Sequence, residues 1–284
     1  MKKILMVTPE FFDVEYAINP YMTSSDGQLH KIDRLKAQSQ WNELRNAYSK
    51  LGYAVDVLPG VKGLPDMVFA ANQSFPFWDH KKEQPSVIIS SMRSEFRKNE
   101  VSYFEKYYSE NKYTIYHLPL DKFGEKSGQA FEGNGDALIR PGRKQIFGGY
   151  GFRTDKNVYN EIQRITNYEI FLLELKKEHF YHLDTCLSFL DENTIAIVPE
   201  AFTSDDLRSL KNKFANIIEI DIDEAKNNFA GNCHCPDGKN VILQSGSEKL
   251  IKSLHNHGFK TIEVDTSEFM KSGGSVFCMK MMCY

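Results

Sequence analysis

A cysteine near the end of the chain could serve as a nucleophile. Cys278 stands in the segment Gly-Gly-Ser-Val-Phe-Cys-Met-Lys-Met-Met (273–282), after a glycine pair and before a short apolar run typical of a last core strand. A single cysteine is usually a small buried hydrophobic residue, whereas a thiol at the mouth of a site can attack an electrophilic carbon as its thiolate. The side chains that other loops place beside Cys278 decide between these interpretations.

Polar loops with side chains capable of chemistry recur along the chain. They contain Asp66, Glu132, His182, Asn232 and Cys278. The marker residues are spaced roughly 46 to 66 positions apart, a period typical of repeated supersecondary units. Any α/β protein shows helices and strands at similar intervals, but here chemically capable groups fall at the same place in each repeat. We therefore predict a site built from loops on a rigid scaffold.

The segments between these loops predict helix followed by strand. Ala37, Trp41, Leu44, Tyr48 and Leu51 lie on one helical face before Gly52, and the alternating segment 53–59 follows. The same order returns four times, in 94–111 with 113–118, 157–167 with 168–175, 204–214 with 217–222, and 247–257 with 259–265. Each loop precedes a hairpin-like pair of strands. Five such units around an axis would bring the loops to one end.

Composition predicts an ordinary soluble globular protein. The chain has 284 residues, 41% hydrophobic and 26% charged, and its net charge of −3 is made of interspersed signs, so nucleic acid is not an expected partner. No apolar run approaches the roughly 18 residues of a membrane span, and the first segment is too short for a signal peptide, which predicts a cytoplasmic protein without membrane contact. Five scattered cysteines make no disulfide framework.

The loop residues together would form an anionic pocket. The candidate set is Asp66, Glu132, Asp136, His182, Asp184 and Cys278. His182 and Asp184 are two residues apart and would therefore share one face of a strand. A thiol reacts as thiolate, and surrounding carboxylates oppose its ionisation. A cationic substrate resolves this conflict, because the carboxylates hold it while its charge stabilises the thiolate. Guanidinium is the natural candidate, since its planar fork of N–H donors pairs with carboxylates.

Two other motifs could suggest a metal site or a phosphate site, but their spacing does not support either. Cys233-His234-Cys235 could suggest zinc, but a single close cluster without a second ligand pair is poor zinc spacing. The glycine-rich segment 131–136 resembles a phosphate loop but lacks the Gly-Lys-Ser/Thr ending and a following helix. We therefore predict neither a metal nor another cofactor.

Three motifs in this order resemble a known superfamily. They are Phe-Glu-Gly-Asn-Gly-Asp at 131–136, His-Leu-Asp-Thr at 182–185 and the C-terminal Gly-Gly-Ser-x-x-Cys. They are similar to the guanidine-modifying enzymes, which include arginine deiminases, arginine dihydrolases, dimethylarginine dimethylaminohydrolases and amidinotransferases. The resemblance covers nearly the whole chain. It implies an α/β fold, a five-fold pseudosymmetric propeller of ββαβ units, with residues 1–284 as one catalytic domain.

The resemblance also implies residue roles. Cys278 would attack the guanidinium carbon, His182 would protonate the departing nitrogen and then activate water, and Asp184 and Glu132 would grip the guanidinium and relay protons. Substrate-binding roles are implied for Arg153, Asn19, Asn72, Asp66, Phe69 and Asp136. A structural role is the alternative for four of these residues: Arg153 and Asn19 could be surface groups, and Asp136 and Asn72 could serve only to shape a turn.

Asp184 is the acid of a His-x-Asp motif. By resemblance, arginine deiminases and amidinotransferases carry this acid and dimethylargininases generally lack it, so its presence favours an unsubstituted guanidinium as substrate. The chain is also short for a classical arginine deiminase. The sequence thus favours hydrolysis of L-arginine, either to ornithine, ammonia and carbon dioxide or only to citrulline. Dimethylarginine hydrolysis, amidino transfer and a non-catalytic guanidine-binding protein stay as alternatives, as does a homo-oligomer.

Overall fold

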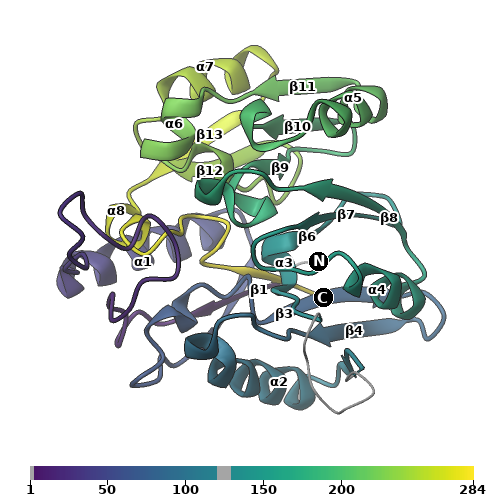
Figure 1. The fold of residues 1–284 in the computed structure, drawn as a ribbon, viewed down its shortest axis with the longest axis horizontal. Helices are drawn as coiled ribbons and strands as arrows, with labels where there is room; N and C mark the ends of the chain where they lie inside the picture. The colour runs from purple at the N-terminus through teal and green to yellow at the C-terminus, as the bar shows by residue number, and fades with distance from the viewer. Residues whose placement is uncertain (1–2, 120–128) are drawn as a thin grey trace.

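The computed structural model describes residues 3–119 and 129–284 (Figure 1). Strands in these residues form separate sheets with the orders β14-β1-β2, β3-β4-β5, β6-β7-β8, β9-β10-β11 and β12-β13. Their bounds are β1 Lys3–Val7, β2 Ala54–Leu58, β3 Ser74–Asp79, β4 Gln84–Ile89, β5 Thr114–His117, β6 Ala137–Ile139, β7 Gln145–Tyr150, β8 Glu169–Glu174, β9 Leu187–Phe189, β10 Thr194–Ile197, β11 Asn216–Glu219, β12 Asn240–Gln244, β13 Lys260–Val264 and β14 Met281–Cys283.

Helices connect the strands. The α-helices are α1 Arg34–Lys50, α2 Val101–Glu110, α3 Gly133–Asp136, α4 Val158–Thr166, α5 Ser204–Lys213, α6 Ile222–Asn227, α7 Glu248–Asn256 and α8 Ser267–Met270. Short 3-10 helices are η1 Pro65–Val68, η2 Glu95–Glu100, η3 Glu178–Phe180, η4 Leu183–Thr185, η5 Pro199–Ala201 and η6 Ala230–Asn232. No helix among the described residues is both long and apolar enough to cross a bilayer.

Each repeated unit has the same strand directions. In the unit β6-β7-β8 the first pair is antiparallel and the second is parallel. A parallel pair needs a crossover, and α4 supplies it by burying Val158, Tyr159 and Ile162. The helix ends at Asn167, whose φ of 58° suits an asparagine in the left-handed region. The chain then enters β8, as the sequence predicted.

The units are arranged with strands inside and helices outside. Figure 1 shows α1, α2, α4, α5 and α7 around the outer rim and the strands toward the middle, with both chain ends drawn near the centre of the view. Within the described residues no strand ladder joins one sheet to the next. The units are therefore held together by packing and by their central loops.

The predicted α/β fold of repeated ββαβ-type units is confirmed. All five predicted helix-then-strand pairs are present, and the predicted last strand is β14. Two predicted hairpins were wrong in detail. The fourth unit keeps only a bridge between His234 and Ile242, and in the fifth β14 pairs antiparallel with β1 from the other end of the chain. The C-terminal segment thereby completes the first unit.

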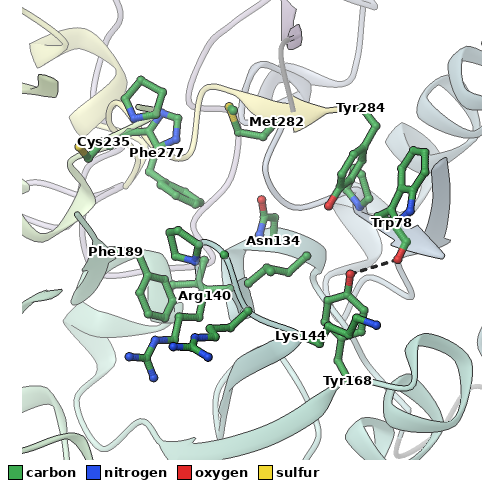
Figure 2. A pocket seen from close by; sticks show the side chains of 18 of the residues that line it. Trp78, Asn134, Arg140, Lys144, Tyr168, Phe189, Cys235, Phe277, Met282 and Tyr284 are labelled. Carbon is green, nitrogen blue, oxygen red and sulfur yellow. Dashed lines mark hydrogen bonds between the residues drawn. The ribbon is translucent and has the colours of Figure 1, made fainter. Parts of the chain in front are cut away.

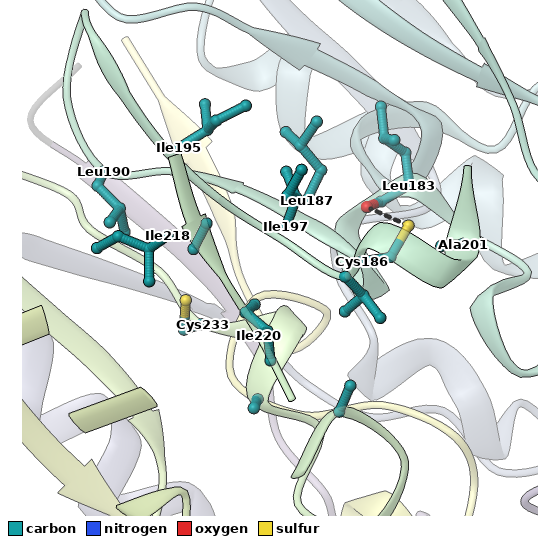
Figure 3. Packing of buried hydrophobic residues seen from close by; sticks show 14 of the residues in the cluster. Leu183, Cys186, Leu187, Leu190, Ile195, Ile197, Ala201, Ile218, Ile220 and Cys233 are labelled. Atoms are coloured by element: carbon teal, nitrogen blue, oxygen red, sulfur yellow. Dashed lines mark hydrogen bonds between the residues drawn. The ribbon is translucent and has the colours of Figure 1, made fainter. Parts of the chain in front are cut away.

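The largest hydrophobic cluster packs behind the His182 loop. Figure 3 shows Leu187, Ile195, Ile197 and Ile218 from neighbouring strands packed together, with Leu183 and Cys186 beside them. These side chains have no exposed surface or almost none. Burial of aliphatic side chains on this scale contributes about 1.5–3 kcal/mol each. The loop that carries His182 therefore rests on a rigid base.

Candidate active site

Loops from several units meet at a small buried pocket. Its lining consists of Ile18, Asn19, Asp66, Phe69, Asn72, Arg97, Arg153, Tyr181, His182, Ser272, Gly273 and Cys278. Seven of the residues predicted from sequence line this pocket: Cys278, His182, Asn19, Asp66, Phe69, Asn72 and Arg153. Glu132, Asp184 and Asp136 do not line the pocket. Glu132 and Asp184 contact the lining residues His182 and Cys278, and Asp136 accepts a hydrogen bond from Leu183, the residue after His182.

Cys278 is positioned by an asparagine from the neighbouring unit. Its backbone amide donates to Asn232 Oδ1 at 3.2 Å, and Asn232 Nδ2 lies 3.2 Å from Cys278 Sγ. Asn232 Oδ1 also accepts from the amides of Ser275 and Phe277. One side chain therefore fixes the whole Cys278 loop and supplies a donor to the sulfur, which favours a thiolate.

The thiol of Cys278 also faces a carboxylate. It donates to Asp184 Oδ2 at 3.2 Å, and burial together with Asp184 raises the pKa of Cys278 well above its usual value. Burial in turn raises the pKa of Asp184 to about 7, while Cys278 and Lys280 act in the other direction. Asp184 Oδ1 has no hydrogen-bond partner among the described residues. Asp184 therefore has one carboxylate oxygen available for a further hydrogen-bond donor beside Cys278.

His182 is held by Glu132. His182 Nε2 lies 2.7 Å from Glu132 Oε2, and both side chains are almost completely buried. Burial alone would raise the pKa of Glu132, but Arg153 and the hydrogen bond to His182 outweigh it and hold that pKa well below its usual range. Glu132 is therefore a carboxylate at neutral pH that can stabilise a protonated His182.

The local structure around His182 differs from the prediction. We expected His182 and Asp184 on one face of a strand, but His182 precedes the 3-10 turn η4. The turn directs the two side chains to different partners, Glu132 and Cys278. The Thr185 hydroxyl donates to His182 O at 2.6 Å and stabilises this turn, which explains why the strand does not form.

Arg153 lies between the pocket and its mouth. It donates to Glu132 Oε2 at 3.1 Å and to Ile18 O at 2.8 Å, and its guanidinium stacks 4.8 Å from the ring centroid of Tyr181. A wider depression of about 710 Å³, to which Arg93 and Arg153 contribute, lies over this wall. The pocket itself has only about 10 Å³ of free volume, so a ligand enters only after side chains move.

Asn72 is oriented by a buried arginine. Arg97 donates to Asn72 Oδ1 at 2.9 Å and forms an ion pair with Glu100 at 2.9 Å. The amide nitrogen of Asn72 is buried without a hydrogen-bond partner in the described part of the chain. A Cβ on Gly135 would lie 2.4 Å from this nitrogen and 3.3 Å from the His182 ring, so the free donor lies near the imidazole.

Asp66 and Asn19 hold the glycine loop before Cys278. Ser272 donates to Asp66 Oδ1 at 2.8 Å, and Asn19 Nδ2 donates to Ser272 O at 3.0 Å. Phe69 packs so closely that a Cβ on Gly274 would lie 2.3 Å from its ring. The glycine pair is therefore required by close approach of Asn19, Tyr181 and Phe69.

Asp136 supports the His182 loop from behind. Its carboxylate accepts from Thr154 Oγ1 at 2.7 Å and from the backbone amide of Leu183 at 3.1 Å. Burial raises the pKa of Asp136 to about 6, although His182 and Thr154 favour its charged form. These contacts match the structural role that the sequence left open for this residue.

Two functional candidates were missed from sequence. Asn232 falls at the repeat period, and that position was a signal for a role beside Cys278. Arg97 gave no such signal, because a basic residue inside a predicted helix is usually exposed. The structure instead buries it at 3% exposure, where it donates to Glu100, Asn72 and the backbone oxygens of Asp66 and Phe69. In the described residues, no three His, Cys, Asp or Glu side chains are grouped to hold a metal.

A buried cysteine, a histidine and carboxylates carried by loops of a repeated α/β fold are what the resemblance to guanidine-modifying enzymes implied, and comparison with known proteins places the chain in that class. A family model described as N,N dimethylarginine dimethylhydrolase, eukaryotic, matches residues 8–283. The chain belongs to this family.

Relatives include both dihydrolases and dimethylarginine hydrolases. The bifunctional arginine dihydrolase/ornithine cyclodeaminase AgrE from Nostoc sp. is 34% identical over 98% of this chain, which spans only 37% of that protein. The N(G),N(G)-dimethylarginine dimethylaminohydrolase from Mycobacterium tuberculosis is 34% identical over 98% of this chain and 84% of its own. A crystal structure of the N-terminal domain of the cyanobacterial arginine dihydrolase ArgZ, bound to substrate, has a TM-score of 0.87 and 32% identity, covering 98% of this chain and 97% of that one.

Replacing Asp184 by asparagine should weaken binding of a guanidinium. The change keeps the shape but removes the carboxylate, and breaking a desolvated ion pair costs about 3–5 kcal/mol, which is roughly 150- to 4,000-fold in affinity. Calorimetry with arginine in the Cys278→Ala background measures this without turnover. Asp205→Asn, at an exposed site, is the matched control and should change nothing. Equal affinity in both variants would show that Asp184 does not hold the cation.

The pH dependence of this affinity has a defined sign. A protonated Asp184 offers no negative charge to a cation. Because burial raises the pKa of Asp184 to about 7, binding of a cation below that pH requires Asp184 to lose its proton. Arginine affinity should therefore rise as pH increases through about 7 and then level off. An affinity independent of pH between 5.5 and 8.5 contradicts this expectation.

Proposed function

We propose that residues 1–284 act as one catalytic domain that hydrolyses L-arginine to ornithine, two ammonia and carbon dioxide through a covalent intermediate on Cys278. The observation that carries the proposal is the set of groups that meet at the pocket: a thiol beside a half-satisfied Asp184, a histidine held by Glu132, and the free amide nitrogen of Asn72. A guanidinium beside these groups would donate to the free oxygen of Asp184, and its charge would stabilise a Cys278 thiolate.

In the first step the guanidinium charge offsets Asp184 and favours the Cys278 thiolate. Sulfur attacks the central carbon, an S–C bond forms, and His182 gives its proton to the departing nitrogen, which leaves as ammonia. The Glu132 carboxylate, 2.7 Å away, stabilises the protonated histidine before the transfer.

In the second step His182, now neutral, takes a proton from water as the water attacks the thiouronium carbon. The S–C bond then breaks and citrulline forms with regeneration of the thiolate. A repeat of the two steps on the ureido group releases the second ammonia and a carbamate, which gives carbon dioxide and ornithine. Two water molecules are consumed in total.

Continuation to ornithine requires the site to retain citrulline. Its ureido group is neutral and no longer pairs with the acids, so neutral hydrogen bonds must hold it. Asn72 supports this step because Arg97 occupies its oxygen and leaves its nitrogen free. The chain's similarity to arginine dihydrolases over nearly its whole length supports the same choice.

Hydrolysis of dimethylarginine is a second candidate. The matched family model carries that description, and the Mycobacterium tuberculosis relative carries the corresponding name. The test is incubation with arginine, dimethylarginine, citrulline and agmatine, followed by mass spectrometry and an ammonia assay. Ornithine and ammonia in a 1:2 ratio from arginine support the proposal. Citrulline as the sole product, or consumption of dimethylarginine only, overturns the dihydrolase assignment.

Asn72→Ala should make citrulline accumulate from arginine. One hydrogen bond contributes about 0.5–1.5 kcal/mol, which shifts the partition between release and further reaction by roughly 2- to 12-fold. Product ratios at early times measure this partition. Asn111 follows helix α2 and does not line the catalytic pocket, so Asn111→Ala is a control that should keep the wild-type ratio. An unchanged ratio in Asn72→Ala means that Asn72 does not retain the intermediate product.

A further inference from the structure

A second cavity, of about 520 Å³, has no lining residue in common with the catalytic pocket. It is bordered by β3, the β6–β7 turn, the segment after His234 and the last residues of the chain. Phe277 and Lys280 line it, while Cys278 between them lines the catalytic pocket. The cavity therefore lies on the other side of the Cys278 loop.

Aromatic side chains surround this cavity. Figure 2 shows Trp78, Tyr168, Phe189, Phe277 and Tyr284 placed around it, with Asn134 near the middle of the view. Tyr168 is fixed by a hydrogen bond of 3.1 Å from its hydroxyl to Trp78 O. Rigid rings around an open volume suit a flat, conjugated ligand that can stack against them.

The charges at the cavity are all of one sign. Arg140, Arg143, Lys144 and Lys280 line it, and no aspartate or glutamate belongs to the lining among residues 3–119 and 129–284. Arg143 is paired with Glu192 at 2.5 Å, but Lys144 has no ion-pair partner within those ranges. A cavity with low-dielectric walls and one sign of charge concentrates ions of the opposite sign.

Lys280 is the innermost of these cations. Its side chain has no exposed surface, and its ammonium has no hydrogen-bond partner in the described residues. The ammonium lies 3.1 Å from the ring centroid of Phe277. Burial lowers the pKa of Lys280 to about 7, against the attraction of Asp184. A buried ammonium without a hydrogen-bonded anion is costly, and a bound anion would offset that cost.

We propose that this cavity is a binding site for a small planar anion, a conjugated ring that carries a carboxylate or phosphate group. The ring lies among Trp78, Tyr168 and Phe277, and the anionic group faces the basic side of the cavity. The binding step does not depend on the proposed hydrolysis of arginine. Carboxylate and phosphate ligands share the required chemistry, and the probes below distinguish them.

Tryptophan fluorescence tests the proposal. Trp78 lines the cavity, whereas Trp41, the second tryptophan of the chain, is buried against α1 neighbours. Titration with benzoate or adenosine monophosphate should give saturable quenching that is lost in Trp78→Phe. Benzamide and adenosine, the neutral counterparts, should bind at least 10-fold more weakly than the better of the two anions. Calorimetry on Trp78→Phe should still detect the anion.

Matched variants locate the binding. Lys144→Gln and Lys280→Met should each weaken the anion at least 5-fold, while Lys62→Gln, an exposed lysine away from the cavity, should have no effect. Lys144 is exposed, so its replacement should not impair folding, and Lys144→Gln keeps the test decisive even if Lys280→Met does not fold. Saturating arginine in the Cys278→Ala protein should not displace the anion.

Three results would overturn the proposal. They are the absence of saturable binding of both anions at millimolar concentration, equal affinity for the neutral counterparts, and competition by arginine without any effect of Lys144→Gln. The last result would assign the anion to the catalytic pocket.

Discussion

Cys278→Ser is expected to remove turnover almost completely, by on the order of 10⁴-fold or more in kcat, while the protein stays folded. A serine hydroxyl fits the same space and can keep the contacts to Asn232 and Asp184, both at 3.2 Å from the sulfur. It cannot form the anion that attacks the guanidinium carbon under these conditions. Steady-state ammonia release and circular dichroism measure the two effects.

The covalent step gives this experiment a second measurement. Acid quenching during turnover should trap a mass increase on wild-type protein, mapped by peptide analysis to Cys278, and no such adduct on Cys278→Ser. Cys235→Ser is the matched control, since Cys235 is a buried thiol that does not line the catalytic pocket. Loss of activity in Cys235→Ser with retention of activity in Cys278→Ser would show that Cys278 is not the nucleophile.

Glu132→Gln is expected to lower kcat by about 10²–10⁴-fold, the usual contribution of general acid–base catalysis. The amide keeps the size of the side chain but removes the charge that faces His182 at 2.7 Å and Arg153 at 3.1 Å. Protonated His182 then loses its counter-charge, so proton donation to the leaving nitrogen is impaired. Because the pKa of Glu132 is held well below its usual range, its own protonation should not appear in the wild-type pH–rate profile.

The measurement is kcat and KM for arginine between pH 5.5 and 9. We expect the loss chiefly in kcat. Glu200→Gln, at an exposed position, is the control and should leave both constants unchanged. Thermal unfolding separates catalysis from stability, since one-sided loss of a buried ion pair costs about 3–5 kcal/mol. A normal kcat in a folded Glu132→Gln protein contradicts the role of Glu132.

The sequence determined the order of elements and the position of the reactive loops. Helical spacing of apolar residues from Ala37 to Leu51, and the alternating segments that follow each helix, are local patterns that survive packing. The loop period predicted that the loops of Asp66, His182 and Cys278 would meet, and these three residues line one pocket. Asn72, which the family resemblance implied, lines the same pocket. The glycine pair before Cys278 was visible in the sequence, but its reason is tertiary, since Asn19 and Phe69 leave no room for a Cβ.

Tertiary structure alone decided the pairings inside the site. Sequence spacing suggested that His182 and Asp184 share a strand face, but the η4 turn sends them to Glu132 and Cys278, which lie in other repeats. Burial of Arg97 and Lys280 was equally invisible, because a charged residue enters a core only where distant segments supply acceptors or a cavity. Local propensity is set by near neighbours along the chain, whereas the partner, protonation state and access of a buried charge depend on groups that the fold brings from far away.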